Sequence, residues 1–138
     1  METAKILRAA PAWALMLLAC ESSSAAGFTE PMTFGPREVS AETLNHGRDL
    51  YMRHCVSCHG EGGAGDGHAA RSLKFPPRDF RLGELASEPA SHETLVERIR
   101  KGVPERGMPS WKGMREDDLV ALADYIKTFS PRWKDADA

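Results

Sequence analysis

Apolar positions recur every three to four residues in three segments of the chain, which predicts three amphipathic helices. The three segments are residues 41–55, 92–101 and 115–129. In the first, Leu44, Gly47 and Tyr51 share one face, and Ser40 precedes the segment as a helix cap. The second also follows a serine, Ser91, and ends at a glycine. The third opens with three acidic residues, which suit a helix N-terminus, and stops before a Ser-Pro pair.

No segment alternates apolar and polar residues for long enough to predict a strand, so the pattern indicates an all-α fold. Residues 20–40 are rich in Ser, Ala, Gly and Pro, and we expect them to form a flexible tether. Residues 60–89 form a long connection rich in Gly and Pro, which is uncommon in a compact domain unless the loop wraps something. Three short helices also bury little apolar surface, so a domain of this size usually needs a disulfide, metal or cofactor.

The N-terminus carries an apolar run at residues 9–19 after two basic residues. The run is too short to span a bilayer and is typical of an export signal, so we assign residues 1–19 to a signal peptide. The stretch Leu-Leu-Ala-Cys that ends at Cys20 resembles a bacterial lipobox, which makes Cys20 the expected site of lipidation. Cleavage after Ala26 is the alternative. Lipidation would protect a cysteine that is otherwise a free thiol in an oxidising compartment.

Composition limits the class of protein. A chain of 138 residues corresponds to one small domain with additional segments. The hydrophobic fraction of 41% and the charged fraction of 28% describe a soluble globular protein. The formal net charge of −2 provides no overall positive field, so no nucleic acid is expected as a partner.

Cys55, Cys58 and His59 form a Cys-x-x-Cys-His motif, followed by a glycine-rich run. A thioredoxin-like dithiol needs an α/β context, and no strands are predicted. A structural zinc site needs four ligands, and the remaining histidines show no suitable pairing. In covalent haem attachment each thiol adds to one vinyl group and the adjacent histidine ligates the iron. The motif therefore predicts haem c, held covalently by Cys55 and Cys58 with His59 as the proximal ligand.

The chain resembles a monohaem class I c-type cytochrome. The resemblance rests on the haem motif at the end of a helix, the wrapping loop, and a Met-Pro segment between the last two helices. The sequences HGEGGAGDGHAA and FPPRDF are similar to those of small bacterial cytochromes that serve respiratory chains. The resemblance covers residues 41–131, the predicted cytochrome c domain, and leaves residues 132–138 as a short C-terminal tail. It implies a small class I cytochrome c fold, with about three main helices wrapped around one covalent haem.

The resemblance also implies a crossing of the first and last helices, with Gly47 permitting close approach of the two backbones. The residues expected at the crossing are Gly47, Tyr51, Tyr125 and Ile126. The distal iron ligand of the family lies in the Met-Pro segment, which corresponds to Met108. A thioether is a soft ligand, and Met/His ligation raises the reduction potential. Met114 is the nearest alternative and is expected to pack in the core, and His92, as the first residue of a helix, is expected to be exposed.

Other parts of the expected haem site are less specific. The family has a proline whose carbonyl accepts a hydrogen bond from the outer nitrogen of the proximal histidine, and either Pro76 or Pro77 matches it. Arg78, Arg81 and Trp111 either contact the haem propionates or form an exposed basic face and a packing indole. His68, in the glycine-rich run, is expected to be solvated.

The predicted function is one-electron transfer. Two filled axial positions leave no vacant site for a substrate, which favours an electron carrier over an enzyme. We expect an exported protein on the periplasmic side of a bacterial membrane, lipid-anchored, serving redox partner proteins of a respiratory chain or belonging to a larger oxidoreductase complex. The alternatives are a peroxidase-like catalytic haem subunit and a haem-based sensor with a displaceable distal ligand. Ten basic residues against six acidic ones between residues 71 and 115 either orient partner docking or form an ordinary solvated surface.

Overall fold

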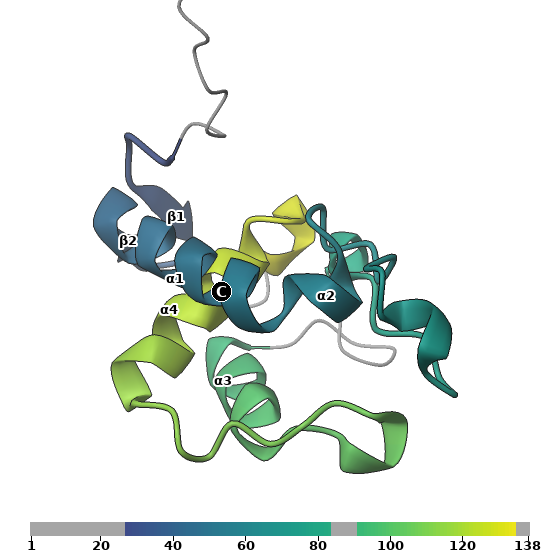
Figure 1. The fold of residues 1–138 in the computed structure, drawn as a ribbon. Helices are drawn as coiled ribbons and strands as arrows, with labels where there is room; N and C mark the ends of the chain where they lie inside the picture. Colours follow the sequence, from purple (N-terminus) through teal and green to yellow (C-terminus); the bar gives the residue numbers. More distant parts are fainter. Residues whose placement is uncertain (1–26, 84–90, 135–138) are drawn as a thin grey trace, which may run out of the picture.

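The computed structural model describes residues 27–83 and 91–134. Within these ranges the chain is mostly helical, with one small hairpin (Figure 1). The α-helices and strands are β1 (Met32–Phe34), β2 (Arg37–Val39), α1 (Ala41–His54), α2 (Val56–His59), α3 (His92–Lys101) and α4 (Glu116–Lys127). Short 3-10 turns are η1 (Ala70–Ser72), η2 (Phe80–Leu82), η3 (Pro104–Arg106) and η4 (Pro131–Lys134). The three predicted helices are confirmed, and the described residues form the mostly helical domain that was expected.

The helix starts follow the predicted caps. The Ser40 side chain accepts a hydrogen bond from the backbone N–H of Thr43, and Ser91 does the same for Thr94 at the start of α3. These bonds satisfy backbone donors that have no partner inside the helix. Helix α3 ends at Gly102, whose φ of 68° lies in the left-handed region that glycine adopts without strain.

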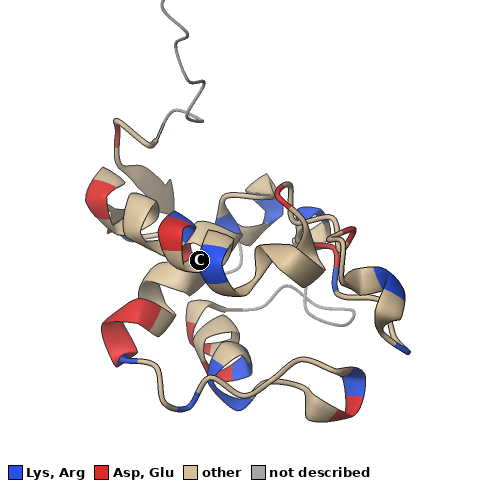
Figure 2. Cartoon of the chain, viewed as in Figure 1, with Lys and Arg blue, Asp and Glu red and all other residues tan. Residues whose placement is uncertain are grey.

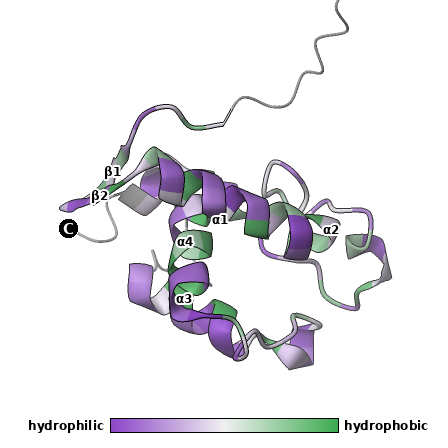
Figure 3. Cartoon of the chain, turned by 60° about the vertical axis from the view of Figure 1, so that its left-hand side comes forward, coloured by the Kyte–Doolittle hydropathy of each residue, from purple (hydrophilic) through white to green (hydrophobic). Residues whose placement is uncertain are grey.

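Helices α1 and α4 cross, as predicted, and the contact depends on Gly47. A Cβ atom at this position would overlap the backbone carbonyl of Ala121, so only glycine allows the two helices to approach this closely. Beside it, the rings of Tyr51 and Tyr125 lie 5.3 Å apart. In Figure 3 much of α4 is green, in agreement with its nearly continuous burial, while α1 is mostly purple because its outer side faces solvent. The crossing forms the centre of the hydrophobic core.

The hairpin is a departure from the sequence analysis, which expected no strand between residues 21 and 40. Strands β1 and β2 pair antiparallel, with Phe34 opposite Arg37 and Gly35 in the turn between them. The side chains of Phe34 and Val39 are buried and form a second small core with Leu44. Each strand has only three residues, which is too short for a readable alternation. The prediction of a flexible tether is therefore wrong for the strand residues, and residues 20–26 lie outside the described ranges.

The C-terminal boundary also differs from the expected one. Trp133, assigned to a tail, is fully buried and belongs to the main core. Its indole N–H donates to the carbonyl of Phe80, with a nitrogen–oxygen distance of 2.8 Å. The folded domain therefore extends past residue 131. The expected signal peptide, Cys20 and the alternative cleavage site after Ala26 lie outside the described residues, and within the described ranges no helix is long and apolar enough to cross a membrane.

Candidate functional site: a cavity between two walls

A cavity of about 300 Å³ lies between two groups of elements. The end of α1, α2 and the following loop form one wall, and α3 with the segment after it forms the other; α1 and α2 are above and α3 below in Figure 1. Cys55, Cys58 and His59 line the first wall, and Met108 lines the second. The rest of the lining is largely apolar and includes Leu73, Phe80, Leu95, Ile99, Val103 and Ile126. The four residues predicted from the sequence to hold one group therefore meet in one cavity.

The two cysteines are brought together by the junction of α1 and α2. Cys55 ends α1, and its carbonyl accepts hydrogen bonds from the backbone N–H groups of Cys58 and His59, at 3.2 and 2.9 Å. Both side chains are half-buried, and neither forms a disulfide within the described residues. Burial and the neighbouring Cys58 raise the pKa of the Cys55 thiol to about 12. A redox-active dithiol needs an accessible thiolate, so this environment argues against a thioredoxin-like role.

His59 is held in one orientation by two contacts. Its Nδ1 donates to the backbone carbonyl of Arg78 at 3.4 Å, and its ring stacks on the buried ring of Phe80 with centroids 4.5 Å apart. Donation from Nδ1 leaves Nε2 as the unprotonated nitrogen, which is the form that binds a metal. Burial lowers the pKa of His59, which also favours the neutral ring.

The acceptor for His59 corrects the assignment to a proline carbonyl. Pro76 and Pro77 both line the cavity, but the hydrogen-bonded carbonyl belongs to the next residue, Arg78. The Pro77 carbonyl instead packs against Gly65, where a Cβ atom would lie only 2.6 Å from the oxygen. Gly65 has φ of 77° and no side chain, which lets the glycine-rich loop approach the proline backbone this closely.

The glycine-rich loop is also tied to helix α1. The Tyr51 hydroxyl donates to the carbonyl of Gly60 at 2.7 Å, within the buried core. Burial raises the pKa of Tyr51, so the hydroxyl stays protonated and the bond is retained. The residue directly after His59 is thereby fixed to the helix that precedes the cysteines.

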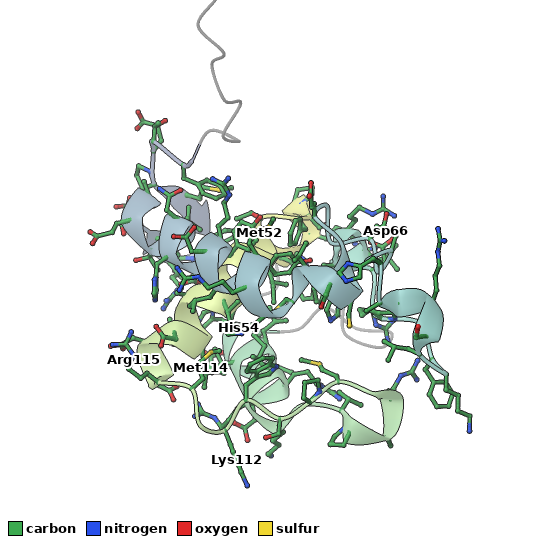
Figure 4. The ribbon with its side chains drawn as sticks, in the orientation of Figure 1. Met52, His54, Asp66, Lys112, Met114 and Arg115 are labelled. Carbon is green, nitrogen blue, oxygen red and sulfur yellow. The ribbon has the colours of Figure 1, made fainter. Side chains whose placement is uncertain are left out.

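Met108 is positioned by a short backbone bridge. Val103 and Met108 exchange two backbone hydrogen bonds, at 2.9 and 3.1 Å, around the turn η3. Farther along, the N–H of Trp111 donates to the carbonyl of Arg100, which ties the segment to the end of α3. Met114 packs against the core and is not among the residues that line the cavity (Figure 4). The structure therefore separates the two methionines as the sequence analysis expected.

Several contacts at the cavity could not be read from the sequence. His54 lies at the end of α1, facing the loop that carries Lys112 (Figure 4), and its ring is 4.9 Å from that of Trp111. This ring pair joins the two walls at the cavity edge. Phe80 and the carbonyl of Arg78 form the support of His59. Phe80 is the last residue of the FPPRDF stretch, but nothing in that sequence indicates that its ring stacks on His59.

The remaining candidates divide between the cavity and the surface. Arg78 and Trp111 line the cavity, whereas Arg81 is paired with Asp79 and does not. His68 is exposed, as expected. His92 is buried, so the expectation that it is exposed is wrong: the hairpin and α4 bring Arg37 and Asp124 next to the start of α3.

Comparison with known proteins gives a consistent family. The model of the family described as cytochrome C oxidase, cbb3-type, subunit III matches residues 42–126. Cytochrome c oxidase subunit 2 of Alkalihalophilus pseudofirmus is 26% identical over 86% of this chain and 36% of its own length. Cytochrome c6 of Cyanidioschyzon merolae is 25% identical over 65% of this chain and 78% of its own length.

A solved structure is similar in fold as well as in sequence. It belongs to the reducing HAO-like protein complex of Kuenenia stuttgartiensis, with a TM-score of 0.57 and 34% identity over 62% of this chain and 41% of the other. The chain thus spans well under half of the oxidase subunit and of the Kuenenia chain. The residues that the family model matches, 42–126, include most of the helical domain that surrounds the cavity.

Proposed function

Since the chain belongs to the family described as cytochrome c oxidase, cbb3-type, subunit III, and is a small class I c-type cytochrome with haem c as its cofactor, we propose that it carries single electrons with a His/Met-ligated haem. Cys55 and Cys58 would hold the haem covalently, and His59 and Met108 would ligate the iron from opposite walls of the cavity. The observation that carries this proposal is the convergence of these four side chains on one largely apolar cavity, with Met114 outside it.

Haem c supplies reversible one-electron chemistry when it is bound. The chain's own residues would tune and protect it. The Arg78 carbonyl and the Phe80 ring hold the His59 imidazole, with Nδ1 engaged in a hydrogen bond, so Nε2 would be the nitrogen that binds the iron. The Met108 thioether is a soft ligand that favours ferrous iron. The apolar lining excludes water, which limits rearrangement of the surroundings when the charge changes.

The experiment is the absorption spectrum of the ferric holoprotein together with carbon monoxide binding to the ferrous form. A low-spin spectrum with the weak charge-transfer band of methionine-ligated haem, and resistance to carbon monoxide, are the expected results. A high-spin spectrum or avid carbon monoxide binding would refute the His/Met carrier and leave the sensor or peroxidase-like interpretations in its place.

We further propose that the protein is exported, is lipid-anchored at Cys20, and serves redox partner proteins of a respiratory chain. The support for the partners is the similarity to an oxidase subunit and to part of the HAO-like complex. The support for the anchor is the Leu-Leu-Ala-Cys sequence. Mass spectrometry of the mature protein tests it: an acylated N-terminal Cys20 is expected, since stable anchoring needs at least two acyl chains. An unmodified N-terminus at Gly27 would mean a freely soluble carrier.

A further inference from the structure

The two walls of the cavity meet at one edge in a cluster built around Phe75. The Arg106 guanidinium lies 5.0 Å and the Lys74 ammonium 5.4 Å from the centre of the Phe75 ring. Leu73 packs beside Gly107, so the loop after η1 touches the turn η3. Phe75 is 37% exposed, which makes it one of the few large apolar side chains at the surface of the described residues. We call Arg71, Lys74, Phe75 and Arg106 the Phe75 face.

The cations on this face, unlike several others on the described surface, have no carboxylate partner among the described residues. Many other cations are in ion pairs with carboxylates: Arg37, Arg81, Arg100, Lys101 and Arg115. Arg71, Lys74 and Arg106 are all exposed, and none forms an ion pair with a carboxylate of the described residues. In Figure 2 the ribbon is blue on both loops at the right-hand edge, with red beside the blue of the lower one. The protein is acidic overall, so this positive patch is a local feature.

The face also adjoins the cavity. Leu73 and Arg106 line it, and Lys74 and Phe75 follow Leu73 directly in the chain. A protein bound to the Phe75 face therefore lies next to the group that the cavity holds, which electron transfer between two proteins requires. An exposed aromatic ring surrounded by cations has the composition of an interface centre, because aromatic and arginine side chains contribute most to binding. Complementary charge around such a centre raises the rate of association.

We propose that the Phe75 face is the docking surface for an electron-transfer protein whose own surface is acidic around an apolar centre. This proposal rests on the proposed function, because it needs a haem in the cavity that accepts one electron. The cations would steer the partner at long range, and Phe75 would be buried on contact.

The test uses the ferric holoprotein and the hydroquinone of an acidic flavodoxin as the probe. One electron passes from the anionic flavin hydroquinone, which becomes the neutral semiquinone, to ferric haem, which becomes ferrous. The second-order rate constant, followed by stopped flow, should fall steeply as ionic strength rises.

In Arg71→Gln/Lys74→Gln the rate constant should be lower by about five- to tenfold at low ionic strength. It should approach the wild-type value at about 1 M salt, where charges are screened. Phe75→Ser should lower it about threefold at every ionic strength.

The matched control is Arg48→Gln/Arg115→Gln, which removes the same net charge far from the face. Arg115 lies on the opposite side of the molecule from both loops (Figure 4). This control should keep the wild-type rate constant within about twofold. An equal loss in the control, or a rate constant without salt dependence, would overturn the proposal. The proposal would also be overturned if Arg71→Gln/Lys74→Gln kept the wild-type rate constant with flavodoxin but lost binding to vesicles that contain phosphatidylglycerol. The Phe75 face would then be a membrane contact. A holoprotein that cannot be reduced by one electron would instead refute the proposed function itself.

Discussion

Helix α4 separates two buried regions with opposite chemistry. On one side Ile126 faces the cavity, in a lining formed largely of apolar residues. On the other side Asp124 and Lys127, both fully buried, lie under the hairpin. Arg37 of the hairpin forms two hydrogen bonds to the Asp124 carboxylate, at 3.2 and 3.0 Å, and His92 Nδ1 lies 3.2 Å from the same carboxylate. One side of α4 therefore packs against the cavity that the haem is proposed to fill, and the other side packs against charged side chains of the chain itself.

The difference shows how each region is stabilised. A buried ion pair contributes little net stability but becomes strongly destabilising when one partner is removed, because a charge is left buried without compensation. Docking of the hairpin therefore depends on Asp124, the fully buried carboxylate that Arg37 and His92 contact and that lies near Lys127. The described lining of the cavity is largely apolar, and we propose that the haem fills it. Substitutions on one side of α4 should leave the other side nearly unchanged.

The largest expected effect is on the cavity side. Cys55→Ala/Cys58→Ala should yield a protein that loses all of its haem under denaturing, acidic extraction, because both thioether bonds are absent. Cys20→Ser, which changes the third cysteine, should retain haem under the same treatment and serves as the control. The measurement is the haem absorbance that remains with the polypeptide after extraction, and haem still bound to the double variant would exclude Cys55 and Cys58 as its attachment sites.

The next effect is on the charged side. Asp124→Ala leaves Arg37, Lys127 and His92 without their shared carboxylate, and we expect the free energy of unfolding to fall by about 3–5 kcal/mol. Denaturation of the holoprotein in guanidinium chloride measures it. Glu97→Gln, which removes an exposed carboxylate paired with Arg100 and Lys101, is the control and should change stability little. If Asp124→Ala also shifted the haem spectrum, the two sides of α4 would not be independent.

The two sides of α4 also differ in how far the sequence predicted them. The haem side was predictable because Cys55, Cys58 and His59 form a contiguous motif, and because capping residues and a glycine mark the helices around it. The charged side was not, because Asp124 and Lys127 look like ordinary surface residues of an amphipathic helix. Their burial depends on a hairpin whose strands are too short to show alternation. Trp133 and the acceptor for His59 were missed because both depend on contacts between distant segments.

The proposed ligand on the far wall, Met108, gives a smaller but sharper test of the cavity side. If Met108 is the soft axial ligand, Met108→Ala should lower the reduction potential by on the order of 0.1 V, within the ~0.8 V range that axial ligands span, and carbon monoxide should bind the ferrous form. Met114→Ala is the matched control and should keep the wild-type potential and spectrum, since its side chain only packs against the core. The reverse result would assign the iron ligand to Met114.

The smallest expected effect concerns pH and the charged side. Burial lowers the pKa of His92 below its usual value, although Asp124 partly offsets this, and Arg37 and Lys127 lower it further. Between about pH 6.5, the usual histidine pKa, and the lower folded-state value, the unfolded chain binds more protons than the folded one. The contribution of His92 to the free energy of unfolding is therefore fully present above about pH 6.5 and is lost as pH falls through the folded-state pKa.

Guanidinium denaturation of the holoprotein should show about 1 kcal/mol less stability at pH 5 than at pH 7.5. His92→Gln should remove that part of the pH dependence, whereas His68→Gln, at an exposed position, should retain it. Equal slopes in wild type and His92→Gln would mean that the buried histidine does not control how the hairpin side responds to acid.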